Sequence, residues 1–253
     1  CEKVIDLDLE FTEKRIVVDA KINKHVNSKN GFARVTISKT TSYFDDEITF
    51  IENAEVIIKE IESGVEYELN FSKENQYYIE IENISKSSDY ELNIYHENNH
   101  YQSKNILRRS PPIGNVKQGQ RKSLNNDEIE IVTSFKDIEN DDNYYLFEFG
   151  KGNLQPADDI YIEGNNFTFS YFINKNKIQN NELEIKMEGI DFQYFKFIIQ
   201  VIIQTNTQNG PFAAPPTSIK GNIYCVNNDS LNPFGYFNVS EYDTFRLKDI
   251  NIN

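Results

Sequence analysis

The chain has 253 residues, a formal net charge of −14 at pH 7 and an aromatic content of 13%, supplied by Phe and Tyr without Trp. This length is enough for one large domain or two ordinary ones, and the aromatic content argues against disorder. The negative charge opposes binding to phosphate backbones, so we exclude nucleic acid as a partner. The sequence has no run of about 18 apolar residues and therefore predicts no helix that spans a membrane.

The first hundred residues alternate apolar and polar side chains with a period of two. In residues 34–38, for example, Val35 and Ile37 alternate with polar neighbours, which is typical of a half-buried strand. About seven short strands in this part of the chain favour a β-sandwich of immunoglobulin-like or transthyretin-like type. The predicted strands lie within residues 14–20, 34–38, 53–60, 66–71, 76–82, 89–95 and 100–105.

The alternation stops in residues 106–126, which are rich in Pro, Gly, Asn and basic residues. Pro111 and Pro112 cannot donate to a sheet ladder, so we expect a domain boundary here. The stretch also carries a small basic island in an acidic chain, for which a solvated linker and a contact with lipid head groups or an acidic partner are the two interpretations. The island consists of Arg108, Arg109, Arg121 and Lys122.

Strands resume after the boundary, followed by one segment with a different period. The predicted strands are 128–135, 143–150, 158–164, 166–173 and 182–189, and the tail 217–242 is expected to form a strand, a loop and a further strand.

The exceptional segment is 191–205, where the polar residues Gln193, Lys196, Gln200 and Gln204 are spaced by three, four and four. This spacing gathers them in one stripe of a helix with apolar residues elsewhere, which predicts a largely buried helix capped by Asp191.

These patterns divide the chain into four parts. They are a tether at 1–13, a β-sandwich domain at 14–105, a linker at 106–126, and a β-rich domain at 127–253 with its helix near 191–205. The predicted fold class is mainly β, with an N-terminal sandwich and a second β-rich domain that contains one buried helix.

The motif HENNH at residues 96–100 has the pattern of a zinc protease, with His96 and His100 on either side of Glu97. That chemistry needs a helix, because only there do residues four apart reach one metal. Asn98 and Asn99 sit in the middle of the motif between two strand patterns, so the sequence predicts a solvated hairpin tip and no metal site.

Other chemical motifs are weak. The acidic clusters at 43–47 and 139–143 lack the ligand spacing and the Gly of a calcium loop, so we interpret them as solvated loops. Cys225 has no His near it in the sequence, and no G-x-S-x-G nucleophile motif occurs. We expect no enzymatic activity, no metal and no cofactor.

The order of several segments resembles the Bacteroidota outer-membrane lipoprotein family known as domain of unknown function 4249. The start CEKVIDLD is similar to the mature N-terminus of that family, and it is followed by RIVVDAKI, VTIS, NAEVIIKE and the pattern Y-x-L-x-I-Y. A proline-containing boundary, an aromatic helix, PPTSIKGNI and FGYF complete the order, and the resemblance covers nearly the whole chain. The stretch 224–237 departs from the family pattern, where a more Gly-rich turn is expected.

The resemblance implies a lipid anchor. Cys1 corresponds to the lipobox cysteine that signal peptidase II leaves at the N-terminus, so a covalent lipid on Cys1 would hold the protein in the bilayer through several acyl chains. The charged residues after it resemble a surface-export signal, and a plain acidic tether is the alternative interpretation. The residues of this possible signal are Glu2, Lys3, Asp6, Asp8 and Glu10.

Family members resemble accessory subunits of outer-membrane β-barrel machines, which implies binding or scaffolding without catalysis. The expected function is that of a lipid-anchored outer-membrane protein, facing the cell exterior, which docks on a TonB-dependent transporter or a similar β-barrel. The alternative is a structural subunit of a complex for outer-membrane protein assembly or for surface-lipoprotein export.

Overall fold

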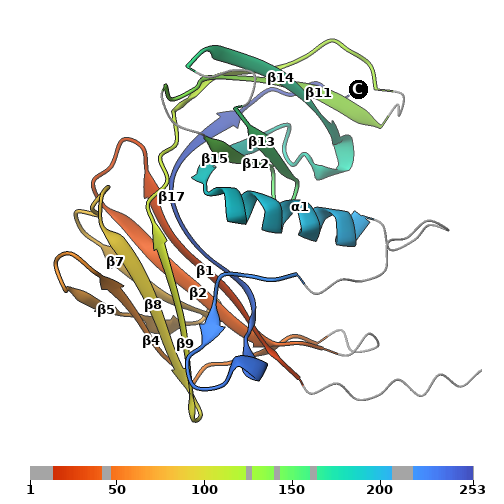
Figure 1. The fold of residues 1–253 in the computed structure, drawn as a ribbon. Coiled ribbons are helices and arrows are strands. Elements are labelled where there is room, and N and C mark those ends of the chain that lie inside the picture. The colour runs from red at the N-terminus through yellow and green to blue at the C-terminus, as the bar shows by residue number, and fades with distance from the viewer. Residues whose placement is uncertain are drawn as a thin grey trace, which may run out of the picture.

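We describe a computed structural model of the protein, which places residues 14–41, 47–123, 127–139, 143–159, 164–206 and 219–252. These residues form three sheets and one α-helix (Figure 1). The predicted mainly β fold with an N-terminal sandwich and one helix is confirmed.

The first half of the chain supplies the strands at the lower end of Figure 1. They are β1 (Ile16–His25), β2 (Gly31–Lys39), β3 (Thr49–Phe50), β4 (Glu55–Glu60), β5 (Glu66–Glu68), β6 (Asn70–Ser72), β7 (Gln76–Ile81), β8 (Asp89–His96) and β9 (Asn99–Ile106).

The second half supplies the strands at the upper end, the helix α1 (Phe192–Asn206), and two strands that return to the lower end. The strands are β10 (Ile113–Gln118), β11 (Glu128–Lys136), β12 (Tyr144–Phe149), β13 (Leu154–Asp158), β14 (Asn166–Asn174), β15 (Leu183–Ile190), β16 (Tyr224–Cys225) and β17 (Phe234–Leu247), with short 3₁₀ helices η1 (Lys175–Lys177) and η2 (Asp229–Leu231).

A nine-stranded sheet runs through the whole molecule, in the order β13-β12-β15-β17-β1-β2-β7-β6 with β3 beside β2. A five-stranded sheet, β16-β9-β8-β4-β5, covers its lower part, and a three-stranded sheet, β10-β11-β14, covers its upper part. Each end of the long sheet is therefore buried against a different partner sheet.

The lower core is aliphatic. Strand alternation points Val18, Ala20 and Ile22 of β1 inward, where they meet Ile58 of β4 and Leu92 of β8, all with 0% exposure. This confirms that the period-two pattern of the first hundred residues marks the inner face of a sandwich.

The upper core is aromatic. Phe135 of β11 packs edge-on against Tyr145, and Phe147 packs edge-on against Phe169, with ring centroids 5.1 Å and 4.9 Å apart. Edge-to-face pairs of this kind are favourable because the positive ring edge meets the negative ring face.

Strand β17 joins the two ends of the molecule. Its first part, Phe234 to Tyr242, pairs in parallel with β1, and its last part, from Tyr242 to Leu247, pairs antiparallel with β15. One continuous strand therefore belongs to both cores.

A buried ion pair fixes β17 to β1. Lys24 Nζ lies 2.7 Å from Glu241 Oε1, and both side chains are almost fully buried. Lys86 adds a second cation at 3.0 Å. Burial alone would raise the pKa of Glu241, but hydrogen bonds and charges from Lys24 and Lys86 outweigh it, so that the pKa is lowered and the carboxylate stays ionised.

The helix begins where the sequence predicts. Asp191 accepts a hydrogen bond of 2.9 Å from the backbone N–H of Tyr194, as an N-cap does, and it also accepts from Asn105 and from the hydroxyl of Tyr236, each at 3.0 Å. In Figure 1 the helix lies inside the curve of the long sheet.

The helix is less buried than predicted. Only Tyr194 and Ile198 are classed as buried among its described side chains, against Leu146, Ile190 and Tyr236, whereas Phe192 and Ile203 are each 47% exposed. The sequence pattern identified the polar stripe, but it does not show that the neighbouring sheet covers only one face of the helix.

Two further expectations about strands are corrected. Residues 66–71 form two strands in different sheets, because the chain crosses from β5 to β6 at Leu69, whose backbone N–H donates to Val56 O over 2.9 Å. The segment 106–126 contains a strand, β10, after its two prolines. Of the strand expected at 158–164, Asp158 ends β13 and residues 160–163 lie outside the described part of the chain. The division into domains stays a prediction.

Candidate functional site

The residues predicted to carry the lipid and the export signal, Cys1, Glu2, Lys3, Asp6, Asp8 and Glu10, lie outside the described residues. The described chain begins at Lys14, beside β1 and at the lower end of the sandwich. A recess opens at the same end, and it is the strongest candidate for a functional site.

The HENNH motif forms a tight hairpin at this end. Residues His96 and Asn99 are the last pair of the β8–β9 ladder, so Glu97 and Asn98 make the turn. The predicted hairpin is confirmed, but the prediction of a solvated tip is wrong for His96, which is 6% exposed.

The two histidines point to opposite faces of the sheet. His100 faces outward, where its ring stacks on Tyr95 with centroids 4.4 Å apart and its Nε2 lies 2.8 Å from Asn93 Oδ1. His96 points inward, toward the recess. Because the imidazoles diverge, they do not form the metal-binding pair that the motif has on a helix.

We call the recess the sandwich-end pocket. It has a volume of about 520 Å³ and lies between the start of β1, the end of β2, the β8–β9 hairpin and η2. Its lining residues are Lys14, Arg15, Ile16, Lys39, His96, Glu97, Asn99, Tyr101, Ser230 and Leu231. No single segment of the sequence carries this set, because the pocket forms only where four distant parts of the chain meet.

His96 is the unusual member of this lining. Neither ring nitrogen has a hydrogen-bond partner among the described residues, and Nε2 lies 3.5 Å from Glu97 Oε1, beyond the usual hydrogen-bond range. Burial lowers the pKa of His96, Glu97 raises it and Lys39 lowers it, with a net decrease from the ordinary value of 6.5. The imidazole is therefore neutral at pH 7 and offers one donor and one acceptor.

Arg15 separates the sandwich-end pocket from a neighbouring recess of about 410 Å³. Its guanidinium carbon lies 4.4 Å from the centre of the Phe234 ring, and one terminal nitrogen donates to the carbonyl of Asn232. Its Nε is buried with no hydrogen-bond partner among the described residues. Two contacts therefore hold the Arg15 guanidinium in place, while its Nε–H has no hydrogen-bond partner among the described residues.

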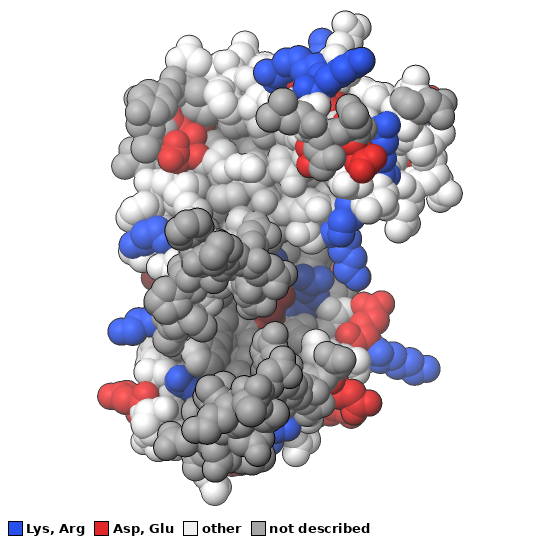
Figure 2. Space-filling view, turned by 90° about the vertical axis from the view of Figure 1, so that its right-hand side faces the viewer, with Lys and Arg blue, Asp and Glu red and all other residues white. Residues whose placement is uncertain are grey.

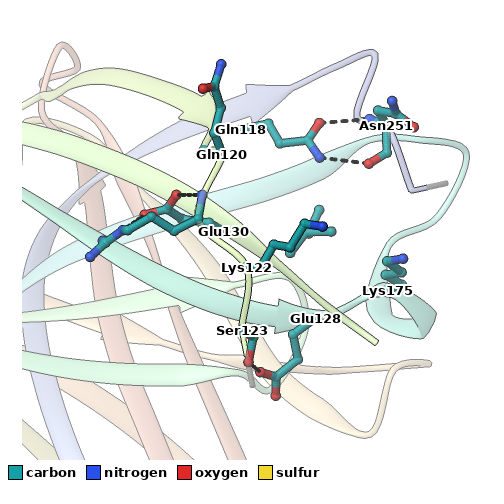
Figure 3. Close-up of a pocket in the computed structure, with 11 residues that line it drawn as sticks. Gln118, Gln120, Lys122, Ser123, Glu128, Glu130, Lys175 and Asn251 are labelled. Carbon is teal, nitrogen blue, oxygen red and sulfur yellow. Dashed lines mark hydrogen bonds and ion pairs between the residues drawn. The ribbon is translucent and has the colours of Figure 1, made fainter. Parts of the chain in front are cut away.

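A third recess, the upper pocket, has a volume of about 360 Å³ and contains part of the basic island. Figure 3 shows Gln118 joined to Asn251 by two hydrogen bonds of 2.7 and 2.8 Å, with Lys122 and Lys175 extending at the rim. Ser123 donates to Glu128 over 2.5 Å.

Arg121 has a structural partner at this site. Its Nε lies 2.5 Å from Glu130 Oε1, and its backbone N–H donates to Oε2 over 2.8 Å. The hydroxyl of Ser170 and these contacts lower the pKa of Glu130 to about 2. Part of the basic island therefore stabilises a buried carboxylate, which the linker interpretation did not foresee.

The outer face of α1 is a second candidate surface. Phe192 is half exposed under Lys196, whose Nζ lies 4.4 Å from the ring centre, and Ile203 is exposed about three turns beyond Phe192. Figure 2 shows the side of the molecule to which the C-terminal end of α1 points: uncharged residues cover much of its upper half, and Lys and Arg gather at the top.

The described residues offer neither a metal cluster nor a helix that spans a membrane. No group of three or more His, Cys, Asp or Glu within them is arranged to hold a metal ion. None of their helices is sufficiently long and apolar to cross a bilayer. The acidic cluster at 43–47 lies almost wholly outside the described residues, and the cluster at 139–143 lies partly outside them.

The geometry defines a mainly β protein in which one long sheet is closed by two shorter sheets, with a cation-lined recess at one end. The chain belongs to the family described as domain of unknown function (DUF4249), which it matches over residues 2–246. This confirms the resemblance to domain of unknown function 4249 found in the sequence.

No curated protein matches the chain. Among solved structures, it is similar to the FN1–FN3 domains of chicken CNTN1, with 9% identity and a TM-score of 0.20. That match covers 88% of this chain and 64% of the other.

Sequence reasoning missed the sandwich-end pocket because it interpreted His96 from its neighbours in the sequence. One signal was available. In the alternation of residues 89–95, Tyr90, Leu92 and Ile94 face the core, and His96 continues that row. A histidine in the inward-facing row of a strand is expected to be buried.

Proposed function

We propose that the protein is a non-catalytic lipoprotein of the outer-membrane surface, which docks on a β-barrel partner such as a TonB-dependent transporter. Its anchor would be the acyl chains on Cys1. Family membership over residues 2–246 supports this proposal, because the resemblance of the sequence to that family implies an accessory role at an outer-membrane barrel.

The observation that carries the docking part of the proposal is the outer face of α1. Phe192 and Ile203 are each 47% exposed and lie about three turns apart, so both project from the same side of one helix. Aromatic side chains of this kind are enriched in the centres of protein interfaces.

The tether length is compatible with such docking. Residues 1–13 would span at most about 45 Å when extended, at roughly 3.3–3.6 Å per residue. The body could therefore reach the side or the rim of a barrel while Cys1 remains in the bilayer. Substitution of Cys1 by Ser is expected to release the protein from membranes, and fractionation of the cell envelope would measure this.

The docking surface is tested by a pull-down of the lipidated protein in mild detergent, with the partner identified by mass spectrometry. The double variant Phe192→Ser/Ile203→Ser should lose the barrel, whereas the matched control Ile61→Ser/Val65→Ser, which changes two exposed apolar residues of the β4–β5 connection, should retain it. Retention of the barrel by the α1 double variant would contradict docking through this helix.

The identity of the partner distinguishes the import role from its alternative. A transporter recovered in equal amount would support an import accessory. Recovery of barrel-assembly or lipoprotein-export components would favour the structural subunit, and a growth or envelope defect on deletion of the gene would agree with that alternative.

A further inference from the structure

The sandwich-end pocket concentrates positive charge in an acidic protein. Among the described residues, Lys14, Arg15 and Lys39 line it against one carboxylate, Glu97, so this lining has more cations than anions although the whole chain carries −14. Glu97 is also 65% exposed, so its charge is better screened than charges inside the recess. The pocket is therefore attractive to anions.

The pocket also contains two buried polar groups that need a partner. His96 is 94% buried with both ring nitrogens unpaired among the described residues, and Arg15 Nε is buried and unpaired in the same sense. These nitrogen atoms are almost closed off from solvent, so a ligand group reaches them only with a rotation of the two side chains, and an acceptor that does so removes the penalty of an unpaired buried donor.

The remaining lining is suited to an organic ligand. Ile16 and Leu231 are partly buried apolar residues that pack against the sandwich core, and Tyr101 of β9 is 3% exposed. A volume of about 520 Å³ is larger than a bare inorganic ion needs and lies within the range of small-molecule sites. Charge at one side and apolar surface at the other match an amphiphilic anion.

We propose that the sandwich-end pocket binds a small organic anion, with its carboxylate or phosphate group bonded to His96, Arg15 and Lys39 and its apolar part on Ile16 and Leu231. A neutral imidazole donates through its N–H to such a group, and the two cations supply charge-assisted hydrogen bonds. This site is separate from the α1 face, so the binding proposal and the docking proposal are independent of each other.

The test uses the three histidines of the chain as reporters. In the full chain at about 150 mM salt, the imidazole Cε1–H signals of His25, His96 and His100 are assigned by single His→Asn variants and followed by NMR. Hexyl phosphate and hexanoate are the probes, and hexanol is the uncharged control. We expect one or both anions to shift the His96 signal saturably, with little change at His25 and none from hexanol.

The two other histidines make this readout specific. His25 ends β1 at the opposite end from Ile16, about 30 Å away at roughly 3.4 Å per residue. His100 lies on the outer face of the sheet. Equal shifts at all three signals, or an equal effect of hexanol, would overturn the proposal.

A charge variant tests the mechanism without disturbing the core. Lys39→Gln should weaken binding of the anion about tenfold, because it removes one charge-assisted contact worth roughly 1.4 kcal/mol. The control Lys59→Gln removes a lysine that pairs with Glu66 on the surface and should leave binding unchanged. Unfolding temperature checks that both variants fold. Unchanged binding in Lys39→Gln would overturn the assignment of the anionic group to this pocket.

The phosphate version of the ligand has two sources, a soluble phosphate ester or a lipid head group. Phosphatidylcholine vesicles with and without phosphatidic acid are added to the hexyl phosphate complex. Displacement by the phosphatidic acid vesicles alone would support a lipid head group as occupant, and lack of displacement, with hexyl phosphate still bound, would support a soluble ligand.

Discussion

The lower and upper cores of this protein each lie between the long sheet and a shorter sheet, but they are packed with different residues. The lower core lies between the long sheet and a five-stranded sheet and is made mostly of Ile, Val, Leu and Ala. The upper core has only a three-stranded cover and is rich in Phe and Tyr. An aromatic side chain buries about 150–250 Å², so a smaller cover sheet can still exclude water when its residues are larger.

The comparison also concerns charge. The lower core ends at the buried pair Lys24–Glu241, in which both charges are removed from water. The upper core ends at Glu130, whose partner Arg121 has a side chain that is 68% exposed. We expect loss of one partner to lower the stability of the protein strongly at the buried pair Lys24–Glu241 and less strongly at the pair Arg121–Glu130.

The largest expected effect is that of Gly235→Ala in β17. Gly235 has φ = +111°, and an added Cβ would lie 1.8 Å from Val18 O, so the alanine variant should lose more than about 4 kcal/mol of unfolding free energy. Gly152→Ala is the matched control: it also has a positive φ, +81°, but no atom within 4 Å of the added Cβ, and should cost about 1–2 kcal/mol.

Met187 and Cys225 are natural probes that report whether the two cores unfold together. Met187, the only methionine, lies in the upper core, and Cys225 lies in the lower core. In a Cys1→Ser background, we expect thiol exposure and the loss of the native methyl signal at the same urea concentration in the Gly235→Ala variant. A native methyl signal with a reactive thiol would show that the upper core is stable by itself.

Glu241→Gln comes next in size. It leaves Lys24 buried without a carboxylate, which should cost about 3 kcal/mol in urea unfolding at pH 7. The exposed pair Lys59–Glu66 is the control, since Glu66→Gln should change stability by less than about 1 kcal/mol. If both variants lost the same amount, burial would not be what distinguishes the two pairs.

Glu130 should give the upper core a pH dependence. Its pKa in the folded state is about 2, below the ordinary 4.5, so its contribution is present above pH 4.5 and is lost as the pH falls toward 2. After allowance for the exposed Arg121, this contribution is about 2 kcal/mol. The stability difference between wild type and Glu130→Gln should therefore shrink between pH 5 and pH 2, and a constant difference would contradict the lowered pKa.

The smallest expected effect is a gain. Glu97 occupies the hairpin turn with φ = 54°, a conformation that glycine adopts without penalty. Glu97→Gly should stabilise the protein by about 0.5–1 kcal/mol, measured by urea unfolding. It also removes the one carboxylate among the described residues of the pocket lining, so anion binding at His96 should become tighter in the same variant.

The sequence predicts well what depends on neighbours in the chain. Strand alternation located most of the hairpin strands, and the spacing of polar residues with Asp191 as cap located α1 despite its β-branched residues. It cannot predict the parallel pairing of Val17 with Phe234, since contacts between segments so distant in sequence have no local signal.

The candidate site follows the same rule. The hairpin of HENNH was predictable from Asn98 and its flanking strands, because turn chemistry is local. The burial of His96 depends on β1, β2 and η2 closing around it, and the missed strand β10 follows two prolines that mark a boundary in most sequences. In both cases, the burial of His96 and the strand β10, the structure is decided by packing against other segments of the chain, which the local sequence does not show.

The position of β17 has a consequence for how the chain acquires its structure. Lys24 meets Glu241 across 217 residues of sequence, and β17, the strand that both cores share, follows every other strand of the described chain. Contacts of such long range are slow to form, so a growing chain cannot complete the long sheet until β17 has been made. Folding of the long sheet is therefore expected to finish with one step, the insertion of β17 between β1 and β15.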